Sequence, residues 1–415
     1  MNNDLLLKGD GQDILIRDGI VFGRGSGFEL RPGTRTVDVR GCLVTRGFAD
    51  IHVHLREPGY SYKETILTGT RAAARGGFTT VCAMPNLDPV PDCPENLEKE
   101  LEIIRRDAVV EVLPYAAITK GRKGCELVDF AALQDRCVAF SDDGSGVQDG
   151  EVMLKAMQEA ARLDCIIAAH CEDNSLLHGG YIHDGRYCAE HGHRGISAES
   201  EWRQIERDLE LCERTGCRYH VCHVSTARSV ELIREAKARG VRVSCETAPH
   251  YLLLCDDDLR EDGRFKMNPP LRSAEDREAL IEALRDGTVD AIATDHAPHS
   301  AAEKALGLRD SAMGVTGLET AFPVLYTGLV LKGRISLGRL LEAMSDAPRR
   351  IFRLDNPLSE SEPADLTVID LNEKYTIDSG SFLSMGRSTP FDGMEVYGRI
   401  LMTIKDGEPV WEEKR

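Results

Sequence analysis

The chain has 415 residues, of which 42% are hydrophobic and 29% charged, a composition typical of a folded globular protein and not of a disordered or fibrous one. Its 51 Lys and Arg against 69 Asp and Glu give a net charge of −18, which opposes nucleic-acid binding and means that an anionic ligand needs local cations or a metal ion. The thirteen Cys include no CxxC pair, and no apolar window reaches the length of a signal-peptide core or a membrane span. We therefore expect reduced thiols and a cytoplasmic location.

Both ends of the chain show short apolar runs separated by Gly, Asp and Pro, a pattern typical of short strands joined by tight turns. It covers residues 5–45 and returns in 364–370 and 399–404, after a linker-like Asp355-Asn356-Pro357 stretch. The pattern predicts one small β-domain built from both termini, comprising residues 1–46 together with 354–415.

Residues 47–353 alternate strand-like apolar runs with longer amphipathic segments such as Ser229–Arg239 and Ala274–Arg285, which indicates repeated βα units around a parallel sheet. Eight such units predict an α/β fold, a (β/α)8 TIM-like barrel whose chemistry lies at the carboxyl ends of its strands. The predicted strands are Asp50–Leu55, Thr79–Met84, Glu111–Ala117, Cys137–Ser141, Cys165–His170, Arg218–His223, Arg242–Thr247 and Ala291–Asp295.

The first predicted barrel strand contains a His-x-His pair, His52 and His54. Residues two apart on a strand leave the same face, so both imidazoles can meet one metal ion. The chain carries a second pair with the same spacing, His191 and His193, in a Gly-rich stretch that is typical of a solvated turn. Spacing alone is therefore a weak signal.

Further metal-ligand side chains close other predicted strands. His170 ends strand five, His223 ends strand six and Asp295 ends strand eight. Each taken singly could be a buried His or a helix-capping Asp, but all of them would face one barrel mouth, and this convergence favours a metal site. Strand four ends in Asp142 and Asp143, either of which could bridge two metals or form an Asp-Gly turn.

These motifs resemble the dihydroorotase family of the amidohydrolase superfamily over about residues 47–353. The resemblance rests on segments that contain the candidate ligands or follow predicted strands. They are His52 to Gly59, Arg75 to Thr80, Met84-Pro85-Asn86, His170 to Asp173, Cys245 to His250, Lys266 to Arg272 and Thr294 to His299.

The resemblance implies zinc as the cofactor, with one or two ions per chain. His52, His54 and Asp295 would hold one ion, His170 and His223 the other, and Asp143 would bridge them, with Asp142 as the second choice. Many relatives bridge through a carbamylated Lys, whereas this chain resembles the bacterial type that carries Asp in the Ser-Asp-Asp-Gly motif.

The implied activity is the reversible cyclisation of N-carbamoyl-L-aspartate to L-dihydroorotate in de novo pyrimidine biosynthesis. Asp295 would move the proton, Arg56, Asn86 and His299 would bind the substrate carboxylate, and Asn268 would contact the substrate ring. Each of these four also has an ordinary role as a surface, turn or loop residue. Residues 300–316 resemble a loop that closes over the site.

Two alternatives stay open at this stage, a related cyclic amidase of the hydantoinase or dihydropyrimidinase type and a non-catalytic dihydroorotase-like subunit of an aspartate transcarbamoylase complex. The absence of Lys from 137–146 counts against the first, and the full set of candidate ligands counts against the second. The chain departs from the family pattern at Leu87 and at Ser345-Asp346-Ala347-Pro348, away from any proposed ligand. A small-molecule substrate, a homodimer and an association with aspartate transcarbamoylase complete the implied partners.

Overall fold

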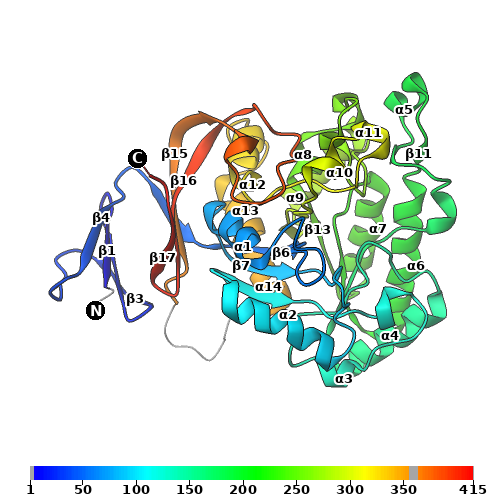
Figure 1. Cartoon of the computed structure of the whole chain (residues 1–415), viewed down its shortest axis with the longest axis horizontal. Coiled ribbons are helices and arrows are strands. Elements are labelled where there is room, and N and C mark those ends of the chain that lie inside the picture. The colour runs from blue at the N-terminus through cyan, green and yellow to red at the C-terminus, as the bar shows by residue number, and fades with distance from the viewer. Residues whose placement is uncertain (1–3, 355–362, 415) are drawn as a thin grey trace.

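A computed structural model describes residues 4–354 and 363–414. Both described ends of the chain lie in a β-rich part at one side of the molecule, and the helices gather around a barrel at the other (Figure 1). The expected linker at Asp355-Asn356-Pro357 lies outside the described residues.

The β-rich part consists of two four-stranded sheets. The first has the order β3-β2-β1-β4 and the second the order β17-β16-β15-β5. Strand β5 pairs antiparallel with β15, with Leu43 opposite Ile369, so residues from both halves of the sequence share one sheet. The bounds are β1 Leu5–Lys8, β2 Asp13–Arg17, β3 Ile20–Gly25, β4 Arg35–Asp38, β5 Leu43–Arg46, β15 Leu366–Thr376, β16 Glu395–Lys405 and β17 Glu408–Glu412.

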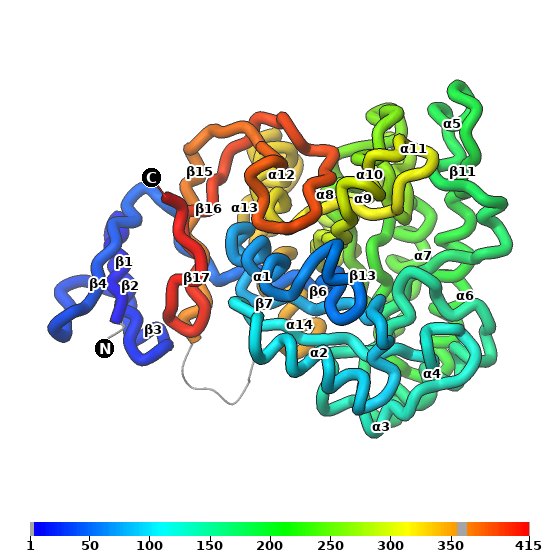
Figure 2. The backbone as a smooth tube through the Cα atoms, in the orientation of Figure 1, coloured from blue at the N-terminus to red at the C-terminus, as the bar shows by residue number. Residues whose placement is uncertain are grey.

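The β-rich part has a hydrophobic core of its own and also packs on the barrel. Leu5, Leu7 and Ile14 from the first strands lie in one buried cluster with Leu366 and Ile404 from the last ones. Strands β16 and β17 contact helix α1 (Ile66–Arg75), and Figure 2 shows these red strands between the blue N-terminal sheet and the barrel. The predicted β-domain from both termini is confirmed, while its residue bounds stay a prediction.

The barrel is assembled from two parallel sheets joined by single bridges. Strands β6 (Phe48–Val53), β7 (Phe78–Ala83) and β8 (Glu111–Pro114) form one sheet, and β9 (Ile166–Ala169), β12 (Arg218–Val221), β13 (Val243–Thr247) and β14 (Ala291–Ile292) form the other. Phe140 bridges Ala116 on one side and Ile167 on the other, and Val53 bridges His296 at the opposite seam. The ring is therefore closed, and the predicted (β/α)8 fold is confirmed.

Six predicted strands are shorter than the sequence indicated, and three of them are much shorter. The fourth, Cys137–Ser141, is reduced to bridges at Phe140, the third ends at Pro114, and the eighth covers Ala291 and Ile292 only. The backbone beyond these points turns into loops that carry Asp143 and Asp295, so regular pairing stops where the candidate ligands begin.

The helices begin and end at local sequence signals. Helix α9 starts with a capping box in which Ser273 and Asp276 satisfy each other's backbone N–H groups, and it ends at Gly287 in the left-handed conformation. The other helices are α2 Pro94–Asp107, α3 Phe130–Leu133, α4 Gly150–Leu163, α5 Arg186–His191, α6 Glu199–Thr215, α7 Ala227–Ala238, α8 Pro249–Leu253, α9 Ala274–Asp286, α10 Ala301–Lys304, α11 Gly307–Asp310, α12 Ala321–Leu325, α13 Leu337–Leu341 and α14 Ala347–Phe352; the short strands β10 Ile182–His183 and β11 Gly195–Ile196 pair with each other. Within the described ranges no helix is long and apolar enough to cross a membrane.

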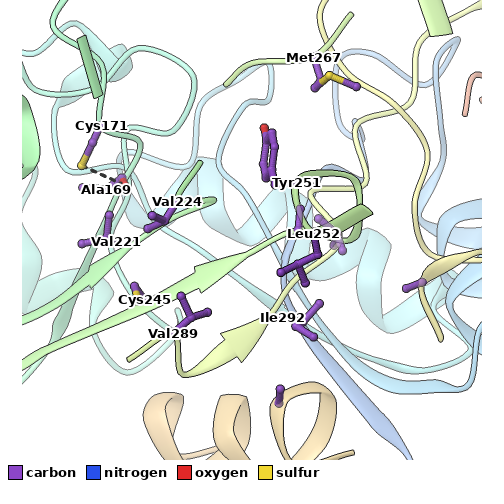
Figure 3. Close-up of a cluster of buried hydrophobic side chains, with 14 of the residues drawn as sticks. Ala169, Cys171, Val221, Val224, Cys245, Tyr251, Leu252, Met267, Val289 and Ile292 are labelled. Atoms are coloured by element: carbon purple, nitrogen blue, oxygen red, sulfur yellow. Dashed lines mark hydrogen bonds between the residues drawn. The ribbon is translucent and has the colours of Figure 1, made fainter. Parts of the chain in front are cut away.

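Barrel strands are buried on both faces, as parallel sheets require. Val221 belongs to the core between strands and helices, whereas its neighbour Cys222 belongs to the cluster inside the barrel. Figure 3 shows the outer core, where Ile292 lies near Leu252 of α8 and Cys245 lies near Val289. All thirteen cysteines have free thiols.

Candidate functional site

His52 and His54 stand at the carboxyl end of β6, and both rings face two carboxylates from other strands. His52 Nε2 lies 3.5 Å from Asp143 Oδ1 and 3.6 Å from Asp295 Oδ1. His54 Nε2 lies 3.1 Å from Asp295 Oδ1 and 3.6 Å from Asp143 Oδ2. All four side chains are buried. The pair predicted from spacing thus converges with carboxylates that are distant in sequence.

His170 and His223 approach the same centre from β9 and β12. His170 Nδ1 lies 3.0 Å from His223 Nε2 and 3.7 Å from Asp143 Oδ1. His223 Nε2 is 3.5 Å from the same Asp143 oxygen. Asp143 therefore has all four histidines around it, which is the position that a bridging carboxylate requires.

Asp142, the alternative bridge, is turned away from the histidines. Its carboxylate accepts hydrogen bonds from the backbone N–H groups of Ile118 and Thr119, at 2.8 and 3.1 Å, and from the Thr119 hydroxyl. These bonds give Asp142 the structural role of an Asp in a turn. The geometry favours Asp143 as the bridge.

The donor set fits a divalent metal ion. His52 Nε2 and Asp143 Oδ1 are buried and have no hydrogen-bond partner, although they face each other across the centre. Buried polar atoms without partners need an explanation, and an ion between them supplies one. Two groups, His52 with Asp143 and His223, and His52 with His54 and Asp295, keep their ligand atoms within 4.8 Å of one another. Imidazole and carboxylate ligands of this kind suit zinc and related ions.

Electrostatics hold Asp143, Asp295 and His54 in states that can bind a cation. Burial alone would raise the pKa values of Asp143 and Asp295, but the surrounding histidines hold both well below the ordinary carboxyl value. Burial lowers the pKa of His54 to about 4, so its imidazole is neutral near pH 7. Ionised carboxylates and a neutral imidazole are the forms in which these groups bind metal.

Several residues at the strand ends adopt strained backbone conformations. Arg56, His223 and Asp295 have positive φ angles of 61°, 35° and 48°, in a region that residues other than Gly rarely occupy. Such strain costs about 1–3 kcal/mol per residue and clusters at functional sites. The strand ends are bent so that these side chains point into the barrel mouth.

The four predicted substrate residues line one cavity with the metal-site residues. The cavity has a volume of about 210 Å³, which suits a small molecule. Its lining residues are His54, Arg56, Asn86, Asp143, Gly144, His170, His223, Asn268, Asp295, Ala297, His299, Met313 and Gly314. His52 is absent from this lining because it lies beneath the other ligands with no exposed surface.

Arg56 supplies the positive charge that lines the cavity, and His299 lies beside it. Arg56 Nε donates to the Pro298 carbonyl at 3.2 Å, and a terminal guanidinium nitrogen of Arg56 is 3.5 Å from His299 Nε2. His299 Nε2 donates to the Met313 carbonyl at 2.8 Å, while its Nδ1 accepts from Lys63 at 3.2 Å. Burial, with the charges of Arg56 and Lys63, lowers the pKa of His299 to about 3, so this ring is neutral.

Asn86 and Asn268 each keep one amide oxygen free. Asn86 Nδ2 donates to the Asp143 carboxylate at 3.2 Å, and Asn268 Nδ2 donates to Glu172 at 3.2 Å. The two Oδ1 atoms are buried without hydrogen-bond partners. They are therefore available to accept hydrogen bonds from ring or ureido N–H groups of a ligand.

The expected closing loop, residues 300–316, contributes directly to the cavity. It contains the short helices α10 and α11, followed by Met313 and Gly314, which line the site. The buried Lys304 ammonium donates to the carbonyls of Lys266, Ala312 and Gly314 at 3.1, 2.8 and 2.7 Å. The segment covers the cavity in this structure.

Sequence reasoning missed Glu246, a buried carboxylate on β13. Glu246 Oε1 is 2.7 Å from His52 Nδ1, and its other oxygen is 3.2 Å from His220 Nε2. Burial by itself would raise its pKa, but the His52 charge and the bonds to both rings lower it to about 2. A Glu inside a predicted barrel strand was the available signal, since such a group is buried only when it is paired.

Known proteins resemble this chain in sequence and in structure. A family model described as dihydro-orotase-like matches residues 41–229. A protein from Geobacillus sp. (strain WCH70) named dihydroorotase is 50% identical over 406 residues, which cover 97% of this chain and 95% of that protein. The solved L-hydantoinase (dihydropyrimidinase) from Arthrobacter aurescens superposes with a TM-score of 0.88 at 28% identity and covers 99% of this chain and 97% of its own. A dihydropyrimidinase from Brevibacillus agri NCHU1002, 23% identical with a TM-score of 0.85 over 100% and 96% of the two chains, has the same fold.

Proposed function

The chain belongs to the dihydroorotase family, and on that premise we propose that it catalyses the reversible cyclisation of N-carbamoyl-L-aspartate to L-dihydroorotate in de novo pyrimidine biosynthesis. The observation that carries the proposal is the convergence of four histidines and two aspartates at the base of one cavity of about 210 Å³, which Arg56 also lines. A small anionic substrate fits a site that is lined by the partly buried guanidinium of Arg56 in a protein of net charge −18.

The metal in this proposal is zinc, with one or two ions per chain. His52, His54 and Asp295 would hold one ion, His170 and His223 the other, and Asp143 would bridge the pair, as the distances between these side chains support. When bound, the ion would activate a water molecule near neutral pH and polarise the carbonyl group of the substrate.

Asp295 is the proposed general base. Its carboxylate lines the cavity, is ionised because the neighbouring histidines hold its pKa low, and lies 3.1 Å from His54. In the hydrolytic direction Asp295 takes a proton from the attacking water. In the biosynthetic direction the same group returns a proton, as microscopic reversibility requires.

Arg56 is the proposed anchor for the substrate carboxylate. Its planar guanidinium matches a carboxylate, and its partly buried position strengthens the pairing. Asn86, Asn268 and His299 complete the binding side, because the free amide oxygens suit substrate N–H groups and the neutral His299 adds no repulsive charge. Together these residues would orient the ring amide toward Asp295.

The hydantoinase alternative has a specific structural observation behind it, since the solved structures with the same fold include hydantoinases. The hydantoinase branch of the amidohydrolase superfamily bridges its metals through a carbamylated Lys. This chain places Asp143 at the centre and has no Lys between Cys137 and Gly146, which supports the dihydroorotase activity.

The test is hydrolysis of dihydroorotate, followed by ultraviolet absorbance, for zinc-loaded protein beside Asp295→Ala, with dihydrouracil and hydantoin as competing substrates. We expect zinc-dependent turnover of dihydroorotate alone, abolished in Asp295→Ala. Turnover of hydantoin or dihydrouracil in its place would move the activity to another cyclic amidase. No turnover of any of the three would favour a non-catalytic subunit.

We also propose a homodimer in the cytoplasm that associates with aspartate transcarbamoylase, on the resemblance to the family. Gel filtration of the chain alone and mixed with that enzyme tests both partners. Elution at the monomer mass contradicts the dimer, and unchanged elution of the mixture contradicts the complex.

A further inference from the structure

His52 is shared by the candidate ligand groups of the metal site. It belongs to both ligand groups described above and to a third, formed with Cys222 and Glu246. Its two ring nitrogens face different surroundings, since Nε2 faces Asp143 and Asp295 while Nδ1 faces Glu246. Which nitrogen carries the proton therefore decides which group of side chains His52 can join.

Glu246 supplies the hydrogen-bond acceptor that determines which ring nitrogen of His52 carries the proton. It lies 2.7 Å from His52 Nδ1, a distance typical of a charge-assisted hydrogen bond. Its second oxygen lies 3.2 Å from His220 Nε2, and His220 Nδ1 lies 2.8 Å from the Ser244 hydroxyl. Glu246 is 1% exposed and both histidines are fully buried, so water does not compete for these bonds.

We propose that Glu246 is a positioning residue that fixes His52 as an Nε2 ligand, with the His220–Ser244 pair holding Glu246 from behind. By accepting the Nδ1–H of His52, Glu246 leaves the Nε2 lone pair directed at the centre between Asp143 and Asp295. This inference rests on the metal site of the proposed function, and it is independent of which substrate the enzyme uses.

The alternative state of His52 explains why the acceptor matters. With the proton on Nε2, the Nδ1 lone pair would face the Glu246 carboxylate, and His52 would join Glu246 and Cys222, whose ligand atoms and its own lie within 4.8 Å of one another. That group would compete for a thiophilic ion away from the catalytic cavity. A charged acceptor paired with both His52 and His220 stabilises the productive tautomer against it.

Glu172 offers a contrast on the opposite side of the site. Its carboxylate lies 3.6 Å from His170 Nε2, beyond hydrogen-bond range, and it accepts from Asn268 at 3.2 Å. Glu246 makes close contacts to two rings and Glu172 makes none, so the positioning role falls to Glu246.

The experiment compares zinc affinity, by competition with a chromogenic chelator, for the full-length wild type, Glu246→Gln and the control Glu319→Gln. Glu319 is a buried carboxylate that accepts from the backbone of Leu383 and Ser384 and belongs to none of the three ligand groups. We expect zinc binding to weaken roughly 10- to 100-fold in Glu246→Gln and to stay at the wild-type value in Glu319→Gln. The visible spectrum of the cobalt-substituted protein should change in the first variant only.

Thermal unfolding of the metal-free proteins separates positioning from a structural role. The proposal predicts that Glu246→Gln loses part of the stabilisation by zinc, while its metal-free unfolding temperature stays near that of the wild type. Unchanged zinc affinity and cobalt spectrum would overturn it, and so would an equal loss of zinc affinity in Glu319→Gln.

Ser244→Ala provides a second variant if Glu246→Gln does not fold. Removing the hydroxyl that holds His220 should weaken zinc binding roughly 2- to 10-fold, less than loss of the acceptor itself. If Ser244→Ala then binds zinc like the wild type, the chain of hydrogen bonds has no positioning role. If Glu246→Gln binds zinc more weakly than the wild type, but the wild type does not turn over dihydroorotate, this inference stands and the proposed activity is refuted.

Discussion

The chain contains two His-x-His pairs, and they differ in almost everything except their spacing. The ring centroids of His52 and His54 are 5.4 Å apart, and those of His191 and His193 are 6.3 Å apart. Each pair also has a carboxylate, at 3.1 Å between His54 and Asp295 and at 2.8 Å between His193 and Glu261. Neither ring spacing nor the nearest acidic group separates a metal site from a surface turn.

Burial and the direction of the free nitrogens make the difference. Asp295 is 9% exposed, whereas Glu261 is 59% exposed and also accepts from Tyr187. His193 has a hydrogen-bonding group at both ring nitrogens, Tyr181 at one and Glu261 at the other, while His52 keeps Nε2 without a partner. The second pair lies at the end of α5, with His191 as its last residue, at the side of the molecule away from the β-rich part (Figure 1). A ligand site needs unsatisfied donor atoms that converge.

The largest difference between the two pairs should appear when their acidic partners are changed. Asp295→Asn keeps the shape of the side chain but removes the proton acceptor, so kcat for dihydroorotate hydrolysis should fall roughly 10²- to 10⁴-fold. The matched variant Glu261→Gln should retain the wild-type kcat, because that carboxylate lies at an exposed turn. Steady-state kinetics of both purified variants decide the point. Comparable losses would mean that the contrast between the two sites is mistaken.

The next effect concerns the metal itself. His52→Ala removes the ligand shared by both groups around the cavity. Bound zinc and kcat/KM should therefore each fall by about 100-fold or more, which exceeds the loss expected for Glu246→Gln. His191 is exposed and stands two residues before His193, as His52 stands before His54, and His191→Ala should keep the wild-type zinc content and kcat/KM. Metal analysis after dialysis gives the zinc content. A His52→Ala protein with full zinc content would place the ion elsewhere.

A smaller difference between the two pairs should appear when the cation beside each is changed. Arg56→Lys keeps the charge but loses the planar fork, and we expect KM for dihydroorotate to rise roughly 10-fold, about 1.4 kcal/mol of binding, with a smaller change in kcat. Arg194→Lys, an exposed cation next to His193, should change neither constant. A drop in kcat with constant KM would show that Arg56 acts on the reaction and not on substrate binding.

The sequence predicts the barrel and the convergence of ligands because strand ends in such a fold must meet at one mouth. Choosing between Asp142 and Asp143 needs more, since neighbouring residues point in opposite directions and strand four pairs only at Phe140. Hydrogen bonds from Ile118 and Thr119, in the preceding loop, decide which carboxylate turns away.

Glu246 shows a different limit. It lies in the family-like segment Cys245 to His250, but its role depends on His52 and His220, which come from two other strands. Side chains that act through contacts across the barrel have no signature at fixed spacing in the sequence. The same holds for Lys304, whose three carbonyl partners come from its own segment and from Lys266.

The smallest expected effect is at the surface pair, and it tests whether that pair is structural. His193→Ala removes hydrogen bonds to Tyr181 and Glu261 near the surface, so the free energy of unfolding should fall by about 1 kcal/mol. Urea denaturation at pH 7 measures this change, and zinc content and dihydroorotate turnover should equal those of the wild type. A loss of zinc in His193→Ala would instead show that this turn binds metal, since His193 contacts Tyr181 and Glu261 and not the residues of the proposed zinc site.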